Sequence, residues 1–438
     1  MLQVLHNRTY RHLFSAQVIA LVGTGLATVA LGLLAYDLAG PRAGAVLGTA
    51  LAIKMIAYVG VAPVVTAFAD RVPRRAMLVS LDLLRAAVAL MLPFVTAIWQ
   101  VYVLIFILQS ASAGFTPTFQ ASIPDVVADE KDYARALSLS RLASDMESVV
   151  SPMLAAALLT IIGFHDLFAG TVIGFLASAA LVVSVRLPSP RPAERRGIYD
   201  RTTRGLRIYL ATPRLRGLLA INLAVAAAGA MVIVNTVVLV QAQFGRGQES
   251  TALALAAFGA GSMGAALLLP DLLDRLGARV AMLAGGTILV AGLFAGLAVT
   301  AFPWLLALWL LVGVGYSMAQ TPSGLLLRRS AHAEDRPALF AAQFALSHAC
   351  WLLTYPLAGW AGSVAGMPAT FVALGLLGSL ALLAAVLLWP ASDPAELEHV
   401  HAALDPAHPH LADAVATPAG HRHRHVFIID SRHASWPR

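Results

Sequence analysis

Charged residues and cysteines are both scarce in this sequence. Only 12% of its residues are charged, whereas about a quarter of the residues in a soluble globular domain carry a charge. The single cysteine, Cys350, excludes an internal disulfide framework. The sequence contains no glycine-rich loop that could cradle phosphates and no constellation of enzyme residues. These absences exclude an ordinary soluble domain, and they argue against an enzyme and against ATP as the energy source.

Long apolar runs fill the sequence instead. Hydrophobic residues make up 59% of the chain, and the mean hydropathy is +0.76. A helix needs about 20 apolar residues to cross a bilayer. Twelve runs reach this length, and the first is too long for a cleavable signal. We therefore predict an all-α membrane protein with twelve transmembrane helices. The predicted spans are 12–36, 43–68, 76–98, 101–123, 134–162, 166–186, 216–242, 250–273, 279–300, 303–326, 338–362 and 366–390.

Basic residues gather in the loops on one side of these spans, whereas the opposite loops hold only Arg42 and Arg246. Because cytoplasmic loops are enriched in Lys and Arg, we expect both termini in the cytoplasm and the spans in a bacterial inner membrane. The lipid bilayer explains the net charge of +7 without a nucleic-acid partner, and we expect a monomer. The basic residues on the cytoplasmic side include Arg8, Arg11, Arg71, Arg74, Arg75, Lys131, Arg135, Arg275, Arg279, Arg328, Arg329 and Arg336.

The sequence also repeats itself at an offset of 204 or 205 residues. Asp70–Arg75 matches Asp274–Arg279, and Thr116-Pro117 matches Thr321-Pro322. Two six-span halves in this arrangement are typical of a parallel-repeat transporter, whose substrate site lies near the bilayer midplane. The predicted units are a first bundle at 1–186, a basic linker at 187–215, a second bundle at 216–390 and a tail at 391–438.

The predicted fifth span carries charge near its middle, in the segment Arg141–Pro152. Charged residues at this depth are costly and usually functional. Arg141 and Asp145 are four residues apart and can form an ion pair on one helix face. Such a pair could simply lock two helices together. Glu147 has no local cationic partner, which favours a function for this carboxylate.

Other spans carry isolated polar residues. Asp82 and Arg85 are three apart and predict a structural ion pair. Lys54 is interpreted as a counter-ion for Asp145, Glu147 or Asp82. A further set could line a substrate pathway or hold helices together by hydrogen bonds: Gln109, Asn222, Asn235 and Gln320.

His348 lies halfway along the eleventh span, at the depth of Asp145 in the related helix of the first half. An imidazole and a carboxylate together suit a divalent cation or a proton relay. A packing hydrogen bond is an equally good interpretation of His348. Cys350, two residues further, is interpreted as a small buried hydrophobic residue.

The tail holds eight of the thirteen histidines, several of them as His-x-His pairs. Residues two apart in an extended chain point to the same side, and imidazole suits Zn, Cu and Ni. We therefore expect the tail to bind Ni²⁺ at neutral pH and to release it below about pH 6. Arg422 and Arg424 should weaken the binding of a cation, and a solvated, disordered tail is the alternative. The candidate ligands are His399, His401, His408, His410, His421, His423 and His425, with His433 as the eighth histidine.

The loop after the second span resembles the signature loop of the major facilitator superfamily. Asp70, Arg71, Arg74 and Arg75 match the signature, and Pro73 stands where that family has a glycine. The second copy retains a glycine at Gly277. The resemblance implies a conformational switch made of Asp70, Arg71, Arg74, Arg75, Asp274, Arg275 and Arg279. The linker segment 205–216 also resembles the exporter branch of the family, and it can form an amphipathic helix.

The histidine-rich tail and the segment Arg141–Pro152 resemble the nickel-resistance (Nre-type) efflux transporters. This resemblance implies antiport of protons against Ni²⁺, with Co²⁺ as a further substrate and with no cofactor. Under this interpretation, Glu147 couples protons, Asp145 binds the metal, and His348 faces Asp145. Arg141, Gln109, Asn222 and Gln320 complete the pathway. An exporter of drugs or siderophores explains the spans equally well, and a non-transporting membrane sensor is the alternative from another class.

Overall fold

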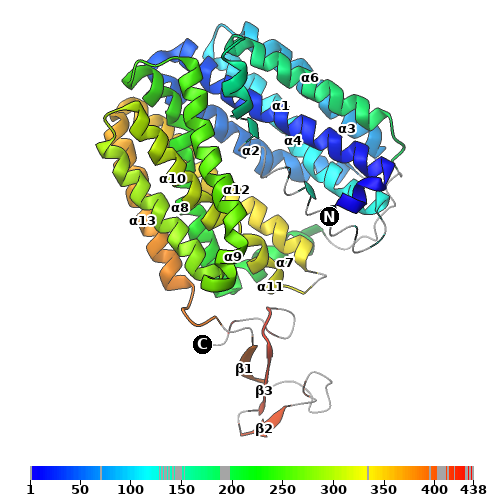
Figure 1. The fold of residues 1–438 in the computed structure, drawn as a ribbon. Helices are drawn as coiled ribbons and strands as arrows, with labels where there is room; N and C mark the ends of the chain where they lie inside the picture. The colour runs from blue at the N-terminus through cyan, green and yellow to red at the C-terminus, as the bar shows by residue number, and fades with distance from the viewer. Residues whose placement is uncertain are drawn as a thin grey trace.

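The fold is known from a computed structural model of the chain (Figure 1). It describes residues 2–69, 72–127, 153–187, 198–332, 335–393, 396–401, 414–418 and 420–429, with residues 129, 132, 136, 139, 140, 143, 150, 151, 411, 433 and 436 between and beyond them. Within this part, only the backbone is described at 2–3, 62–69, 117, 120–121, 124–125, 198–203, 270–272, 274, 336–338 and 341.

The predicted spans form long helices. A helix covers every predicted span except the fifth, most of which lies outside the described residues. In the described part of the chain, nine segments are long and apolar enough to cross a membrane, and the first, Arg8–Val61, contains the first predicted span and most of the second. The helices of the first half are α1 (Arg8–Ala39), α2 (Ala43–Ala69), α3 (Arg74–Met91), α4 (Ile98–Val126) and α6 (Phe164–Val183), with short 3-10 turns at Leu2–His6, Gly40–Arg42 and Leu92–Phe94.

The second half departs from the predicted boundaries at two places. The eighth and ninth predicted spans follow one another directly within α9, where Gly277 turns the chain with a φ of 75° that favours glycine. The tenth predicted span is not one helix, because Thr321-Pro322 separates α10 from α11 and proline has no N–H to continue a helix. The helices are α8 (Pro213–Val237, continued by a π-helix at Val238–Gln243), α9 (Gln248–Ala295, followed by a 3-10 turn at Gly296–Ala298), α10 (Phe302–Gln320), α11 (Ser323–Arg329), α12 (Arg336–Val364) and α13 (Gly366–Leu388).

The helices gather in two groups that lean against each other (Figure 1). In the first group α1 packs on α6, and α3 packs on α4 and α6. In the second, α9 packs on α10, and α8 packs on α12 and α13. The two groups meet chiefly where α2 packs along α12.

Glycines bring α2 and α12 into backbone contact near the beginning of α2. A Cβ atom on Gly359 would lie 2.2 Å from the Gly44 carbonyl oxygen, and one on Gly48 would lie 2.5 Å from the Tyr355 carbonyl oxygen. No larger residue fits at either position without moving a helix. The indole Nε1 of Trp360 donates to Thr49 Oγ1 at 3.1 Å beside this contact.

The predicted ion pair between Asp82 and Arg85 is confirmed. Asp82 is fully buried, and Ser178 Oγ on α6 donates to its second oxygen at 2.7 Å. The Arg85 guanidinium lies 4.1 Å from the ring centre of Phe115 and 4.4 Å from that of Phe175. The pair therefore joins α3, α4 and α6 within the first group. Of the three counter-ions considered for Lys54, Asp82 is paired with Arg85 instead, and Asp145 and Glu147 lie outside the described residues.

The linker contains a helix, α7 (Ile198–Ala211), which covers only the first part of the expected helix at 205–216, because the chain from Pro213 on belongs to α8. Its residues Ile208 and Tyr209 are buried, and the Tyr209 hydroxyl donates to Gln343 Oε1 at 2.5 Å. The Arg204 guanidinium lies 2.6 Å from Asp335 at the beginning of α12. The apolar side of α7 therefore packs on α12.

The tail folds as a small sheet beyond the end of α13, below the second group of helices (Figure 1). Three antiparallel strands lie in the order β1-β3-β2: β1 (Glu396–His401), β3 (Gly420–Val426) and β2 (Val415–Thr417). The sequence had indicated an extended chain but no sheet.

Candidate functional site

The tail sheet brings histidines from two strands onto one face. In the β1–β3 pair, His399 lies opposite His423, and His401 lies opposite His421. Because alternate residues of a strand share a face, His425 joins them. His433, beyond the strand, completes the group.

The imidazoles approach each other closely around His399. Its Nε2 atom lies 3.1 Å from the Nε2 atoms of His401, His423 and His433. In each of two trios, one ring nitrogen from every histidine lies within 4.8 Å of the other two: His399 with His423 and His425, and His399 with His401 and His433. These five histidines are called the imidazole cluster below. One metal ion could draw three of these nitrogens into its coordination shell.

Backbone carbonyls orient two of these rings for metal binding. His399 Nδ1 lies 3.2 Å from the Leu397 carbonyl oxygen, and His425 Nδ1 lies 2.8 Å from that of Val426. A carbonyl oxygen only accepts, so each Nδ1 carries the proton and each Nε2 keeps its lone pair. This is the usual arrangement behind a metal-bound histidine.

The arginines of β3 lie away from the imidazole cluster. Arg422 lies 3.1 Å from Glu398, and Arg424 lies 3.4 Å from Glu396. All four residues alternate with the histidines along their strands, so they occupy the other face of the sheet. The arginines are thus turned away from the histidines and paired with carboxylates, which argues against the expectation that they weaken metal binding; that effect stays a prediction.

Burial favours the neutral form of two rings of the cluster, those of His399 and His423. Burial, with the neighbouring rings of His399, His425, His401 and His433, lowers the pKa of His423 from 6.5 to about 4. Burial also lowers the pKa of His399, although the Leu397 carbonyl opposes the change. Neutral imidazoles are the form that binds metals, so at neutral pH no proton need leave these two rings first.

Other predicted tail ligands have different places. His408 and His410 lie outside the described residues, and His421 belongs to neither trio. His433 was not among the predicted ligands, because its separation from the His-x-His pairs gave no local signal. Only the folding of the chain back onto β1 brings it to His399.

The charged centre of the predicted fifth span, with Arg141, Asp145 and Glu147, lies outside the described residues. His348, its expected partner, is on α12 at the contact with α2. Its Nδ1 donates to the Phe344 carbonyl oxygen at 2.6 Å, and its ring lies 5.4 Å from that of Tyr58. Lys54 Nζ lies 5.8 Å from the same tyrosine ring. In the described part of the chain, Lys54 forms no ion pair.

The remaining candidates for a pathway are spread over three helices. Asn222 on α8 is 2% exposed, and within the described part of the chain neither of its side-chain polar atoms has a hydrogen-bond partner. Gln109 on α4 is 8% exposed, and its side-chain oxygen is also unpaired. Gln320 is the last residue of α10, beside the break at Thr321. No hydrogen bond joins these three side chains. Asn235, by contrast, donates to the Ala358 carbonyl oxygen at 2.9 Å and ties α8 to α12.

Comparison with known proteins identifies the family. A model of the Major Facilitator Superfamily matches residues 13–240 and, a second time, residues 218–425. The chain belongs to this superfamily. The predicted all-α membrane fold with two related helical bundles is thereby confirmed.

Individual relatives in the superfamily are distant. The chain is 29% identical over 216 residues to the uncharacterized MFS-type transporter YhhS of Salmonella enteritidis PT4, a match that covers 49% of this chain and 51% of that protein. It is 26% identical over 152 residues to macrolide efflux protein A of Enterococcus faecalis, covering 32% and 47%. The chain thus spans about half the length of these curated relatives.

Solved structures of superfamily transporters share the fold. A bacterial homologue of the human lysosomal transporter Spinster has a TM-score of 0.69 at 14% identity and covers 87% of this chain and 97% of its own. A D-xylose–proton symporter has a TM-score of 0.62 at 16% identity, covering 88% and 97%. At such identities the likeness shows the fold alone. Membership of the superfamily, together with relatives named as a transporter and an efflux protein, agrees with the expectation that the chain is a transporter and not an enzyme.

The superfamily's signature loops lie only partly in the described structure. Asp70 and Arg71 lie outside it, as does the side chain of Asp274. Arg75 donates to the Val183 carbonyl at the end of α6. Arg279 donates through two nitrogens to the Trp389 carbonyl oxygen, at 3.1 and 3.0 Å. The two arginines thus bind the last turns of α6 and α13, the final helices of the two halves. Arg74 begins α3, and Arg275 is exposed.

Proposed function

We propose that this superfamily member is a secondary active exporter that exchanges protons for a divalent transition-metal cation, with Ni²⁺ as the main substrate and Co²⁺ as a second. The observation that carries the proposal is the imidazole cluster. Imidazole nitrogens without a thiolate or carboxylate among them suit Ni²⁺, Cu²⁺ and Zn²⁺, and not Mg²⁺ or Ca²⁺. The resemblance to nickel-resistance transporters selects nickel among them.

In the membrane part, two carboxylates of the fifth span have different roles, proton exchange and metal binding. Glu147 exchanges protons, because a carboxyl group without a local cation can be protonated near neutral pH when it is desolvated. Asp145 binds the metal, with His348 as its partner from the second half. Lys54, whose charge lies near His348 through Tyr58, repels a cation. A metal ion at His348 therefore needs the carboxylates beside it.

The arrangement in the cell follows from the loop charges. The chain lies in a bacterial inner membrane as a monomer, with both termini and the imidazole cluster in the cytoplasm. The cluster then meets the ion on the side from which it is exported. Loss of the tail should lower metal tolerance without abolishing transport, because the pathway lies in the helical bundles.

A second candidate function is export of an organic drug. The similarity to macrolide efflux protein A of Enterococcus faecalis favours it, and the unpaired buried amides of Asn222 and Gln109 would suit a polar organic substrate as well as a hydrated ion. In this case the tail would be incidental to the transported molecule. Growth of a sensitive host on nickel, cobalt, zinc, macrolides and siderophores separates the two functions.

The direct test is metal flux in inverted vesicles with an imposed pH gradient. Glu147→Gln should abolish pH-driven Ni²⁺ flux but permit downhill exchange, and Asp145→Asn should weaken Ni²⁺ binding itself. Ser347→Ala should keep the wild-type flux, and it serves as the control because Ser347 lies next to His348 but is not one of the residues assigned to the pathway. Undiminished pH-driven flux in Glu147→Gln would refute the assignment. Macrolide flux without nickel flux in the wild-type vesicles would refute the proposed substrate.

A further inference from the structure

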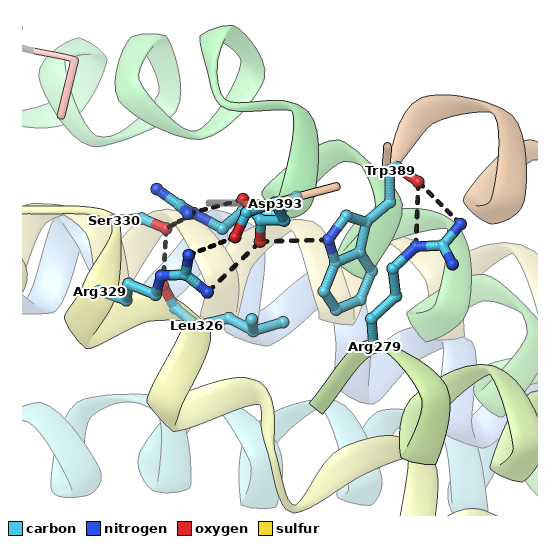
Figure 2. A network of polar contacts seen from close by, with 7 residues as sticks. Arg279, Leu326, Arg329, Ser330, Trp389 and Asp393 are labelled. Carbon is cyan, nitrogen blue, oxygen red and sulfur yellow. Dashed lines mark hydrogen bonds and ion pairs between the residues drawn. The ribbon is translucent and has the colours of Figure 1, made fainter. Parts of the chain in front are cut away.

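Three helix ends of the second half, those of α8, α11 and α13, meet at one carboxylate. Asp393 follows α13, and its Oδ1 lies 2.9 Å from the Arg214 guanidinium in the first turn of α8. Its Oδ2 lies 3.6 Å from Arg329 at the end of α11 and accepts from the Trp389 indole at 3.4 Å (Figure 2). Arg279 of α9 binds the Trp389 carbonyl from the other side. Arg214 also donates to Ser330 Oγ at 2.9 Å.

Arg214 is the buried centre of this network. Its side chain is 2% exposed, and such a guanidinium requires nearly all of its interactions to offset its desolvation. The tail supplies two of these interactions from opposite ends. Asp393 precedes β1, whereas Trp436 lies beyond β3 and places its ring centre 5.0 Å from the guanidinium carbon.

The imidazole cluster lies between these two ends. His399 comes six residues after Asp393, and His433 comes three residues before Trp436. Phe427, 2% exposed, connects the cluster to Trp436, with ring centres 4.9 Å from His399, 4.8 Å from His433 and 5.1 Å from Trp436. An ion that binds His399 and His433 together closes the tail into a loop around Arg214.

We propose that metal binding at the imidazole cluster regulates the helical domain. The bound ion strengthens the contacts of Asp393 and Trp436 with Arg214, and these contacts hold α11 against α8 and α13. This inference rests on the proposed metal binding by the tail, although not on which substrate is transported. These contacts can fix the position of α11, because Thr321-Pro322 separates it from α10 and its far end carries Arg329 and Ser330. The tail thereby reports cytoplasmic metal to the second half of the transporter.

Coupling of this kind is reciprocal. If Ni²⁺ strengthens the contact between Trp436 and Arg214 by some factor, removal of the contact weakens Ni²⁺ binding by the same factor. A guanidinium over an indole suggests a factor of about 3 to 10. Trp436→Leu removes the contact and leaves all five histidines of the cluster in the chain. Trp304→Leu, an exposed tryptophan in the first turn of α10, is the matched control.

The test uses the full-length protein in detergent with NiCl₂ alone as the probe. We expect Ni²⁺ to slow amide hydrogen exchange of residues 323–330 about 3- to 10-fold in the wild-type and Trp304→Leu proteins. Trp436→Leu should bind Ni²⁺ about 3- to 10-fold more weakly and lose this protection at saturating metal. His399→Ala should show no protection.

Three results would overturn the inference. The first is equal Ni²⁺ affinity and equal protection in Trp436→Leu and wild type. The second is tight Ni²⁺ binding that leaves the exchange of α11 unchanged. The third is no Ni²⁺ binding to the tail at all. None of these decides the transported substrate, which the flux measurement in vesicles tests separately.

Discussion

His399 is the residue whose loss should damage metal binding most. It belongs to both trios of the imidazole cluster, so His399→Ala leaves only the pairs His423/His425 and His401/His433. His425→Ala, in contrast, leaves the trio of His399, His401 and His433 complete. One Nε2 atom can bind one ion, so we expect the two trios to be alternatives and the cluster to hold a single ion.

The expected magnitude follows from the number of ligands that remain. Four-ligand zinc sites bind with about 10–16 kcal/mol, or roughly 3 kcal/mol for each ligand. Loss of the third ligand should therefore weaken Ni²⁺ binding about 100-fold in His399→Ala. His425→Ala should cost less than about 10-fold, because an intact trio replaces the lost one.

The assay is calorimetric titration of the full-length protein with Ni²⁺ at pH 7.5. His421→Ala is the matched control, since His421 lies on the same strand and face as His425 but belongs to neither trio. It should keep the wild-type affinity of the tightest site. Equal losses in His399→Ala and His425→Ala, or two equally tight ions at the cluster, would refute the shared-ligand geometry.

Three further predictions follow from charge and packing. Folding lowers the pKa of His423 from 6.5 to about 4, so the folded tail binds fewer protons than the unfolded tail between these values. The stability that this shift contributes to the folded tail should be complete above pH 6.5 and should fall as the pH drops towards 4. Trp436 fluorescence, taken as the difference from Trp436→Phe, should follow this window, and a flat profile would contradict it. Asp82→Asn leaves the charge of Arg85 buried, and it should lower stability by about 3–5 kcal/mol in thermal unfolding, whereas Asp82→Asn combined with Arg85→Met should recover most of the loss. Gly359→Leu should abolish flux by separating α2 from α12, whereas Gly264→Leu, where a Cβ meets no atom within 4 Å, should remain active.

The transmembrane helices could be predicted from the sequence because bilayer thickness sets their length. Their internal breaks were harder to place. Thr321-Pro322 contains a proline that marks the end of α10, yet continuous hydrophobicity concealed it within one predicted span. Gly277 matched a family signature, although only the structure shows the positive φ that joins two helices there.

The tail shows which part of the candidate site could be predicted. The His-x-His pattern placed His399 with His401, and His423 with His425, because strand periodicity is local. Which pair faces which depends on the register between β1 and β3, set by contacts across more than twenty residues. For the same reason the sequence did not reveal that His433 joins the cluster or that Arg422 faces Glu398. In the helices, the contact of His348 with Tyr58 joins the two halves, and no spacing along the chain predicts it.

The contact between Gly44 and Gly359 has a mechanical consequence. Where backbone meets backbone, no side chains interlock, so one helix can tilt over the other without a change of rotamer. Resistance to separation then grows smoothly with the area that is uncovered and requires no repacking of interdigitated residues. The contact between α2 and α12 can therefore act as a pivot with a low barrier to tilting. The free-energy differences between conformations can then be set at other places, by protons, by substrate and by the contacts that hold the helix ends.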